Sequence, residues 1–413
     1  MKRKSRGAKA YQIGLVVLLS LNFGIVFFDR NALSFLMPHI QPELRLSNSQ
    51  VGAFTSALSL SWALSCFLIG RVSDALGKRK TILILSTTIF SSMSFLSGMA
   101  STFAMLLATR LLMGVAEGGV MPISQALIMA EVDSERRGLA MGVMQNFGSN
   151  LLGTFLAPLI LVAISTAFGW RRAFFVAGLP GLAMAVLLFL FVKEPAISKI
   201  PVSGAAAGRR MRFQGIANQN VIICMALSVL MVGFVMVFAT FMPLVLVHDR
   251  HVAPDLMSWL MATFGLSSMI CSILVPGASD ILGRRPVVVI MAFVGAALPL
   301  GLLLLHGPTW QLFAAIGLGA SMTGIFPIVM ATIPSESVAA EHIATVLGMA
   351  MGAGELLGGV LSPLLAGAAA DVVGLKATLW ILTAMSLMTG LLGFLLKETA
   401  PIVLRRRAAT QVS

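Results

Sequence analysis

Charged residues are scarce in this chain. Asp, Glu, Lys and Arg together make up 11% of the 413 residues, whereas 58% are hydrophobic. An ordinary soluble domain carries about 25% charged residues. A chain with this composition cannot hide its apolar surface from water, so the sequence excludes a soluble globular protein and indicates a membrane protein.

Residues that build catalytic or metal sites are also few. The three cysteines lie inside apolar stretches, where a free thiol acts as a small hydrophobe, so no disulfide or metal framework is indicated: Cys66, Cys224 and Cys271. There is no Gly-rich phosphate loop, metal-ligand cluster or nucleophile constellation. The sequence therefore predicts neither an enzyme nor a resident cofactor or metal.

Long apolar stretches, by contrast, run through the whole chain. About 20 apolar residues are needed for an α-helix to cross a hydrocarbon core about 30 Å thick. Twelve such stretches are predicted, at 12–37, 50–70, 80–99, 103–130, 138–165, 172–193, 218–247, 256–279, 286–305, 309–334, 343–370 and 375–396. The fold class is an all-α membrane protein with twelve transmembrane helices.

The net charge of +13 follows the membrane topology. If both termini are cytoplasmic, 22 of the 29 Lys and Arg fall in cytoplasmic segments, as the positive-inside rule requires. The distribution of Lys and Arg therefore indicates how the chain is oriented in the membrane. Binding of nucleic acid is not expected. We expect an integral protein of a bacterial inner membrane with both termini in the cytoplasm.

The chain is also duplicated. The pattern Asp-x-x-Gly-basic-basic begins at Asp74 and again at Asp280, 206 positions later. Lys193-Glu194 after the sixth stretch returns as Lys397-Glu398 after the twelfth. We predict an N-terminal six-helix bundle at 1–193, a cytoplasmic linker at 194–217 and a C-terminal six-helix bundle at 218–413.

Glycines four residues apart suggest where helices pack closely. Such spacing lets the backbones of neighbouring transmembrane helices approach each other. The pairs are Gly114 and Gly118, Gly138 and Gly142, Gly348 and Gly352, and Gly354 and Gly358. We predict that they serve the packing and rocking of helices and not chemistry.

The duplicated motif resembles the loop between helices 2 and 3 in each half of major facilitator superfamily transporters. This resemblance implies the fold of that superfamily, with two pseudo-symmetric halves. In such proteins the motif helps to close the cytoplasmic gate against acidic residues of neighbouring helices. The gate residues implied here are Asp74, Gly77, Lys78, Arg79, Asp280, Gly283, Arg284 and Arg285, with Glu131, Glu135, Glu336 and Glu341 as closing partners.

Five ionisable residues lie inside the apolar stretches: Asp29, Arg30, Arg110, Glu117 and Glu355. Each costs at least about 2.5–3.5 kcal/mol at a helix centre, so such residues usually face a cavity and serve function. Arg110 and Glu117 are seven residues apart and share one helix face, with a rise of about 10 Å between them. The structural alternatives are a static Asp29–Arg30 pair and a merely structural Arg110.

The Asp29-Arg30 pair together with Arg110 and Glu117 is similar to the anion:cation symporter branch of the superfamily, which includes sialin and carriers of galactonate, glucarate and phthalate. The Spinster lipid transporters are a second choice. The resemblance implies that Asp29 and Glu117 exchange protons with Arg110 as charge partner, while Arg30 holds the carboxylate of an organic anion.

Further polar residues are candidate ligands in the fifth and eleventh stretches. Glu355 is the counterpart of Asn150 at an offset of 205 residues, so we expect both to point into the central cavity. Glu355 departs from the branch pattern. It could donate to a substrate hydroxyl when protonated, bind a cationic group, or mark another substrate class. Gln145 and Asn146 complete the set of substrate-binding candidates.

The sequence thus predicts a proton-coupled symporter that imports a small organic anion, such as a sugar acid or an aromatic carboxylate, by alternating access. The alternative is a proton-driven exporter of amphiphilic compounds, a drug or a lysolipid. The expected partners are the organic anion, protons and the lipid bilayer, and the expected state is a monomer.

Overall fold

A computed structural model describes residues 6–133, 136–194, 218–339 and 342–405 of the chain. Within these ranges all regular structure is helical, and twelve helices are long and apolar enough to cross a membrane. The prediction of an all-α membrane protein with twelve spans is confirmed. Of the predicted linker, residues 195–217 lie outside the described ranges.

The chain divides into two compact units. The first comprises Met1–Leu46 and Ala57–Arg209, and the second comprises Ser47–Ser56 and Arg210–Ser413. The first turns of one helix, α2, therefore group with the second unit. Each unit is described by itself.

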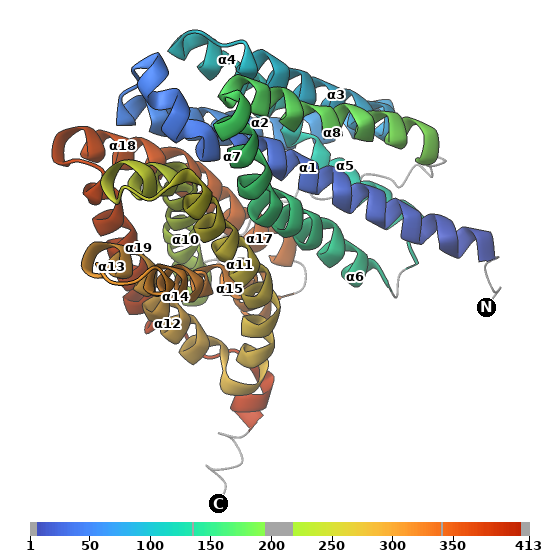
Figure 1. Cartoon of the computed structure of the whole chain (residues 1–413). Coiled ribbons are helices and arrows are strands. Elements are labelled where there is room, and N and C mark those ends of the chain that lie inside the picture. Colours follow the sequence, from blue (N-terminus) through green and yellow to red (C-terminus); the bar gives the residue numbers. More distant parts are fainter. Residues whose placement is uncertain (1–5, 134–135, 195–217, 340–341, 406–413) are drawn as a thin grey trace, which may run out of the picture. The chain divides into compact units, whose positions relative to one another are not determined.

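The first unit is built on long helices that lie alongside one another (Figure 1). α3 packs along α8 and α4, and α1 packs against the η3 segment, α8 and α7. Leu19, Phe90 and Leu127 lie in its fully buried core. The helices are α1 (Arg6–Leu44), α2 (Asn48–Leu76), α3 (Arg79–Gly98), α4 (Phe103–Gly118), α5 (Val120–Glu131), α6 (Arg137–Gly142), η2 (Val143–Phe147), η3 (Ser149–Leu156), α7 (Ala157–Phe168) and α8 (Trp170–Phe191).

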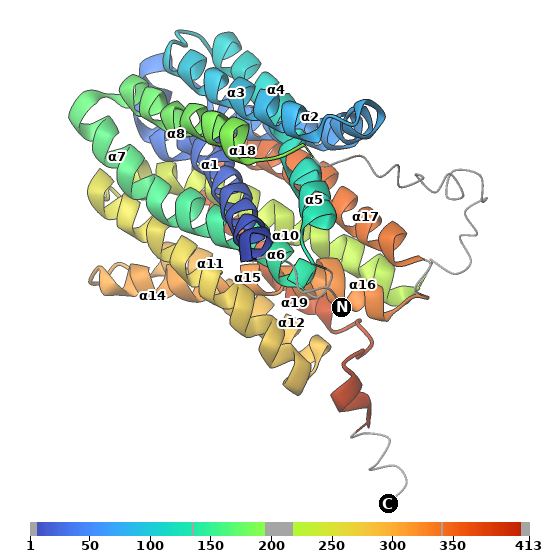
Figure 2. The ribbon, with the colours of Figure 1, turned by 90° about the vertical axis from the view of Figure 1, so that its right-hand side faces the viewer.

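The second unit is likewise a bundle of helices (Figure 2). α10 packs against η8 and α19, and α12 packs along α19. The helices are α10 (Gln219–Leu244), η5 (Val245–Asp249), α11 (Pro254–Leu282), α12 (Arg284–Gly295), α13 (Ala297–Leu304), α14 (Trp310–Gly319), α15 (Ser321–Gly324), η6 (Ile328–Thr332), α16 (Ile333–Glu336), α17 (Ile343–Ala353), η8 (Gly354–Leu361), α18 (Ser362–Val373) and α19 (Lys376–Gly393).

The duplication seen in the sequence recurs in the backbone. Gly77 and Gly283, in the two loop motifs, both have positive φ, at 63° and 109°. Wider π-helical turns also recur at equivalent places, in η3 (Ser149–Leu156) and η8 (Gly354–Leu361). π-helical turns are rare and frequently lie at functional sites, so both units carry the same irregularity in their fifth predicted helix.

The structure separates the predicted glycine pairs into two groups. A Cβ on Gly114 would lie 2.1 Å from the Ser61 hydroxyl of α2, and a Cβ on Gly358 would lie 2.4 Å from the Val229 carbonyl of α10. Gly118 and Gly354 are similarly enclosed, whereas no described atom lies within 4 Å of a Cβ on Gly142, Gly348 or Gly352. Within their unit these last three positions leave room for a Cβ, and the packing role stays a prediction there. The surroundings of Gly138 lie outside the description.

Two glycines of the same transmembrane span give a matched test of close packing. Gly358→Ala should destabilise the protein by about 1–3 kcal/mol, since a methyl group there overlaps the α10 backbone. Gly352→Ala should leave stability unchanged within about 1 kcal/mol, since Ala is the better helix former and meets no neighbour. Thermal unfolding in detergent measures both, and equal effects would contradict the packing described here.

Candidate functional site

Three ionisable side chains are buried together in the first unit. Asp29 of α1 is 0% exposed, and Arg110 and Glu117 of α4 are each 1% exposed. The charge of Arg110 acts on Asp29, and the charges of Arg30, Asp29 and Arg110 act on Glu117. The four residues predicted for proton coupling and anion binding therefore form one electrostatic cluster.

Local structure explains where α4 presents its charged residues. The Thr102 hydroxyl accepts a hydrogen bond from the Met105 backbone N–H and caps the start of α4. Arg110 and Glu117 follow at about two and four turns along the same face. Gly114 between them lies against α2. The helix is thus held so that both charged residues point into the interior of the bundle.

Hydroxyl groups of α3 supply the polar contacts of this cluster. Ser94 donates a hydrogen bond to Asp29 Oδ1 over 2.5 Å. Arg110 donates through Nη2 to the Ser97 hydroxyl, which is also 3.0 Å from the Thr109 hydroxyl. Sequence reasoning missed these serines. The signal available was the run of hydroxyl side chains within an otherwise apolar membrane span.

Much of the cluster's hydrogen-bonding capacity remains unused. Asp29 Oδ2, Arg110 Nε and Nη1, and both carboxyl oxygens of Glu117 are buried without a hydrogen-bond partner. Burying a charged group without partners is costly, and such groups gain from taking up a proton or meeting an opposite charge. The cluster therefore holds several buried polar atoms that a proton or an opposite charge could satisfy.

Arg30 is placed differently from the buried three. Its side chain is half-buried, and its guanidinium lies 5.7 Å from the Phe27 ring and 5.6 Å from the Trp62 ring. Its Nη2 is buried without a hydrogen-bond partner. Two aromatic rings thus orient a guanidinium that retains an unused donor, and Trp62 is a site residue that the sequence did not reveal.

The predicted polar ligands fall on the π-helical segments. Gln145 and Asn146 lie in η2, Asn150 lies in η3, and Glu355 lies at the second residue of η8. Gln145, Asn150 and Glu355 are half-buried, whereas the side chain of Asn146 lies outside the description. The Asn150 carbonyl accepts from the Thr154 hydroxyl. The irregular turns therefore coincide with the candidate ligands in both units.

The second loop motif is tied together by Arg284. Its guanidinium forms ion pairs with Asp280 at 2.5 Å and with Glu336 at 3.1 Å, and it donates to the Ser279 hydroxyl at 2.7 Å. The motif and its predicted acidic partner thus lie together within the second unit. Arg285 follows at the second position of α12, and Glu341 lies outside the described residues.

The first loop motif contacts α5. Arg79 donates to the Ala126 carbonyl of α5 at 3.4 Å, while Glu131 ends α5 and accepts from Gln12 through its backbone carbonyl. Lys78 precedes α3 as an exposed residue. The side chain of Asp74 and the whole of Glu135 lie outside the description.

Glu398 is a motif residue that sequence reasoning missed. Its carboxylate accepts hydrogen bonds from the backbone N–H groups of Arg284 (2.8 Å) and Arg285 (3.2 Å), at the start of α12. Its repeat counterpart Glu194 accepts from Lys80 N–H near the start of α3, at 3.1 Å. Negative side chains stabilise helix N-termini. The signal was the repeated Lys-Glu pair after the sixth and twelfth helices.

No group of three or more His, Cys, Asp or Glu among the described residues could hold a metal ion. The arrangement offers titratable carboxyls and guanidiniums inside a membrane bundle. Such groups can bind an anion and exchange protons.

The sequence profile of the Major Facilitator Superfamily matches residues 19–245 and 224–411, which together span most of the chain. The chain belongs to this superfamily. The fold expected from the duplicated loop motif is thereby confirmed, and the protein is an integral membrane transporter.

Curated relatives of this transporter are named for a hexuronate, for a lactone and for multidrug resistance. The hexuronate transporter of Bacillus subtilis is 29% identical over 62% of this chain and 63% of its own length. The probable 4-methylmuconolactone transporter of Cupriavidus pinatubonensis is 27% identical over 81% and 80%. The multidrug resistance protein MdtL of Salmonella typhi is 23% identical over 86% of each chain. The match to the hexuronate transporter thus spans about three fifths of that relative.

Solved structures with the same fold are also transporters. The transporter superimposes on a D-xylose-proton symporter with a TM-score of 0.78 at 17% identity, covering 94% of this chain and 99% of the other. A bacterial homolog of the human lysosomal transporter Spinster gives a TM-score of 0.75 at 19% identity, covering 93% and 96%. At such identities the likeness shows the fold alone. The curated relatives, by their names, agree with the prediction that the chain is not an enzyme.

The role of Glu398 at α12 can be measured directly. Glu398→Ala should destabilise the start of α12 by about 0.5–2 kcal/mol, the usual loss when a helix N-terminus loses its side-chain acceptor. Hydrogen exchange of the backbone amides of Arg284 and Arg285 should speed up, while exchange across α3 stays unchanged. Glu194→Ala should show the reverse pattern, and unchanged exchange at both helices would contradict these caps.

Proposed function

We propose that this transporter is a proton-coupled symporter that imports small organic anions. The observation that carries the proposal is the electrostatic cluster of the first unit, in which Arg30 retains an unused donor beside a buried cluster that can exchange protons. The names of the hexuronate and 4-methylmuconolactone transporters support a carboxylate or related oxygen-rich solute as substrate.

Arg30 is the proposed anion-binding residue. It is half-buried, whereas Arg110 is 1% exposed and hydrogen-bonded to Ser97. The Phe27 and Trp62 rings orient the guanidinium from two sides. A planar guanidinium can hold a carboxylate through two parallel hydrogen bonds. A substrate carboxylate would accept a hydrogen bond from the unpaired Nη2 of Arg30 and would offset the positive charge of the guanidinium.

Asp29 and Glu117 are the proposed proton carriers, with Arg110 as their charge partner. Glu117 has both oxygens buried without hydrogen-bond donors, and Asp29 has one. The Arg30 charge acts on Glu117. When Arg30 binds a substrate anion, less positive charge remains for Glu117, which then gains more from taking up a proton. Substrate binding and proton uptake would thus favour each other.

The π-helical segments are the proposed source of the remaining substrate contacts. Gln145 and Asn150 offer amides, and Glu355 offers a carboxyl that could donate to a substrate hydroxyl when protonated. Asn146 belongs to the same proposal through its place in η2. Sugar acids carry both a carboxylate and several hydroxyls, which suits a site with one guanidinium and several neutral polar groups.

The loop motifs are proposed to act at the cytoplasmic gate. The ion pairs of Arg284 with Asp280 and Glu336 give the second unit a compact charged corner at the start of α12. Its counterpart in the first unit comprises Gly77, Lys78 and Arg79. This role also rests on the orientation expected from the distribution of basic residues, which places both termini and these loops in the cytoplasm of a bacterial cell.

A second candidate function is export of amphiphilic compounds. The likeness to the multidrug resistance protein MdtL extends over 86% of the chain, and Glu355 provides a carboxyl that could pair with a cationic drug. Under that reading Glu355 and not Arg30 would be the main ligand residue. The two functions therefore predict opposite sensitivities at these two positions.

Arg30→Lys tests the anion site. Lys keeps the charge but cannot form the fork of two hydrogen bonds, so the dissociation constant for a hexuronate or a related carboxylate should rise at least about tenfold, or about 1.4 kcal/mol. Binding is measured by calorimetry on the purified protein. Arg172→Lys, an exposed arginine beside Phe168, is the matched control. Unchanged carboxylate binding, or binding only of lipophilic cations by the parent, would contradict the proposal.

Glu117→Gln tests the proton role separately. A permanently neutral side chain lets the loaded carrier reorient but cannot carry a proton. In proteoliposomes, accumulation driven by a pH gradient should be lost, whereas exchange of labelled for unlabelled substrate should persist within about tenfold of the parent rate. Persistent uphill uptake by this variant would assign coupling to another carboxyl.

A further inference from the structure

A charged pocket lies in the second unit, apart from the residues used above. Its volume is about 380 Å³, within the range of about 300–1,000 Å³ typical of small-molecule sites. Four of its lining side chains can carry charge: Asp249, Arg250, His306 and Lys376. They come from the end of η5, the loops after η5 and α13, and the start of α19.

The pocket lies at the level where membrane spans end. Asp249 is the last residue of one span, Leu304 ends another two residues before His306, and Lys376 begins a third. Two exposed tryptophans mark the same level, Trp310 at the first residue of α14 and Trp380 one turn after Lys376. Exposed Trp and Lys are typical of the boundary between hydrocarbon and headgroups.

Positive charge in the pocket is held in place without a carboxylate partner. Arg250 donates to the Leu302 carbonyl at 3.0 Å and also to the Leu305 carbonyl, which fixes its guanidinium at the end of α13. These acceptors are neutral carbonyls, and no carboxylate oxygen of the described residues lies within 4 Å of its guanidinium nitrogens. Among the described residues Lys376 has no carboxylate oxygen within 4 Å either. An anionic group would offset the positive charges of Arg250 and Lys376.

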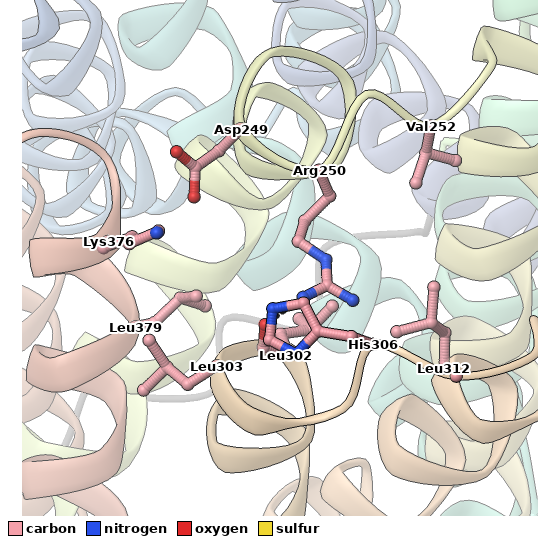
Figure 3. A pocket seen from close by; sticks show the side chains of 10 residues that line it. Asp249, Arg250, Val252, Leu302, Leu303, His306, Leu312, Lys376 and Leu379 are labelled. Atoms are coloured by element: carbon pink, nitrogen blue, oxygen red, sulfur yellow. Dashed lines mark hydrogen bonds between the residues drawn. The ribbon is translucent and has the colours of Figure 1, made fainter.

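The pocket also contains a carboxylate oxygen that receives no hydrogen bond. Asp249 Oδ2 is buried and has no hydrogen-bond donor. Figure 3 shows the Asp249 carboxylate and the Lys376 ammonium on one side of the pocket, with the Arg250 guanidinium beside the His306 ring. His306 Nδ1 lies 3.1 Å from the Leu304 carbonyl and must donate to it, so Nε2 of the neutral ring is an acceptor.

We propose that this pocket binds the headgroup of an aminophospholipid, with the phosphate at Lys376 and Arg250 and the primary ammonium at Asp249. A zwitterion of this kind satisfies both unused charges at once. A purely anionic headgroup brings no positive charge to the Asp249 carboxylate, and a quaternary ammonium has no N–H to donate to it. The position between span ends and exposed tryptophans favours a lipid over a dissolved zwitterion.

The test is calorimetric titration of the full chain in detergent with short-chain dihexanoyl lipids. Phosphatidylethanolamine should bind at least about tenfold more tightly than phosphatidylcholine. Asp249→Asn should reduce this ratio to about twofold or less, since the amide is a poor acceptor for an ammonium. Lys376→Gln should weaken both lipids. Asp255→Asn, an exposed carboxylate near the start of α11, is the matched control and should retain the full ratio.

Each other outcome would overturn the proposal. Equal binding of the two lipids by the parent would exclude the ammonium contact. An undiminished ratio in Asp249→Asn would place the contact elsewhere, and a loss in Asp255→Asn would show a general charge effect. Binding of glycerophosphoethanolamine as tight as that of the lipid would identify a dissolved zwitterion as the ligand. Thermal unfolding of each variant separates lost binding from lost folding, and none of these readouts depends on the transported substrate.

Discussion

The hydrocarbon interior of a membrane supplies no hydrogen-bond partners, and the rest of this structure depends on that constraint. Backbone groups must be satisfied within helices, which accounts for the twelve spans. Ionisable side chains must be enclosed by protein, which accounts for the burial of Asp29, Arg110 and Glu117 inside the first unit. A membrane span can carry such groups only where neighbouring helices shield them from lipid.

The same constraint explains why hydroxyl groups and aromatic rings surround the charges. Ser94 and Ser97 reach Asp29 and Arg110 with short side chains that α3 can hold in place. Phe174 lies 5.7 Å below the Arg110 guanidinium, and Trp62 lies at a similar distance from Arg30. Ring faces stabilise a cation without fixing it as firmly as a carboxylate would. Hydroxyl groups and ring faces thus hold the cluster in place.

Duplication of the chain gives each unit the same devices, and the two copies have diverged in detail. Glu194 and Glu398 both accept from backbone N–H groups near the start of the third helix of their unit. Arg284 forms ion pairs with Asp280 and Glu336, and Arg79 donates to the Ala126 carbonyl. The π-helical turns recur, but the position that Asn150 occupies in the first unit is occupied by Glu355 in the second. The cluster of Asp29, Arg110 and Glu117 belongs to the first unit, and the charged pocket around Asp249 and Arg250 belongs to the second.

The sequence by itself determined the number of membrane spans, the duplication and the identity of the ionisable residues within the spans. These follow from hydropathy, from repeated motifs and from single residues, all of which are local properties. Only the tertiary structure decided that Asp29 meets Ser94, 65 positions away, and that Glu398 caps a helix 114 residues earlier. It also decided which glycines meet a neighbour, since the same four-residue spacing encloses Gly358 and leaves Gly352 open. Such contacts depend on how helices pack, and an apolar stretch facing lipid reads the same as one facing another helix.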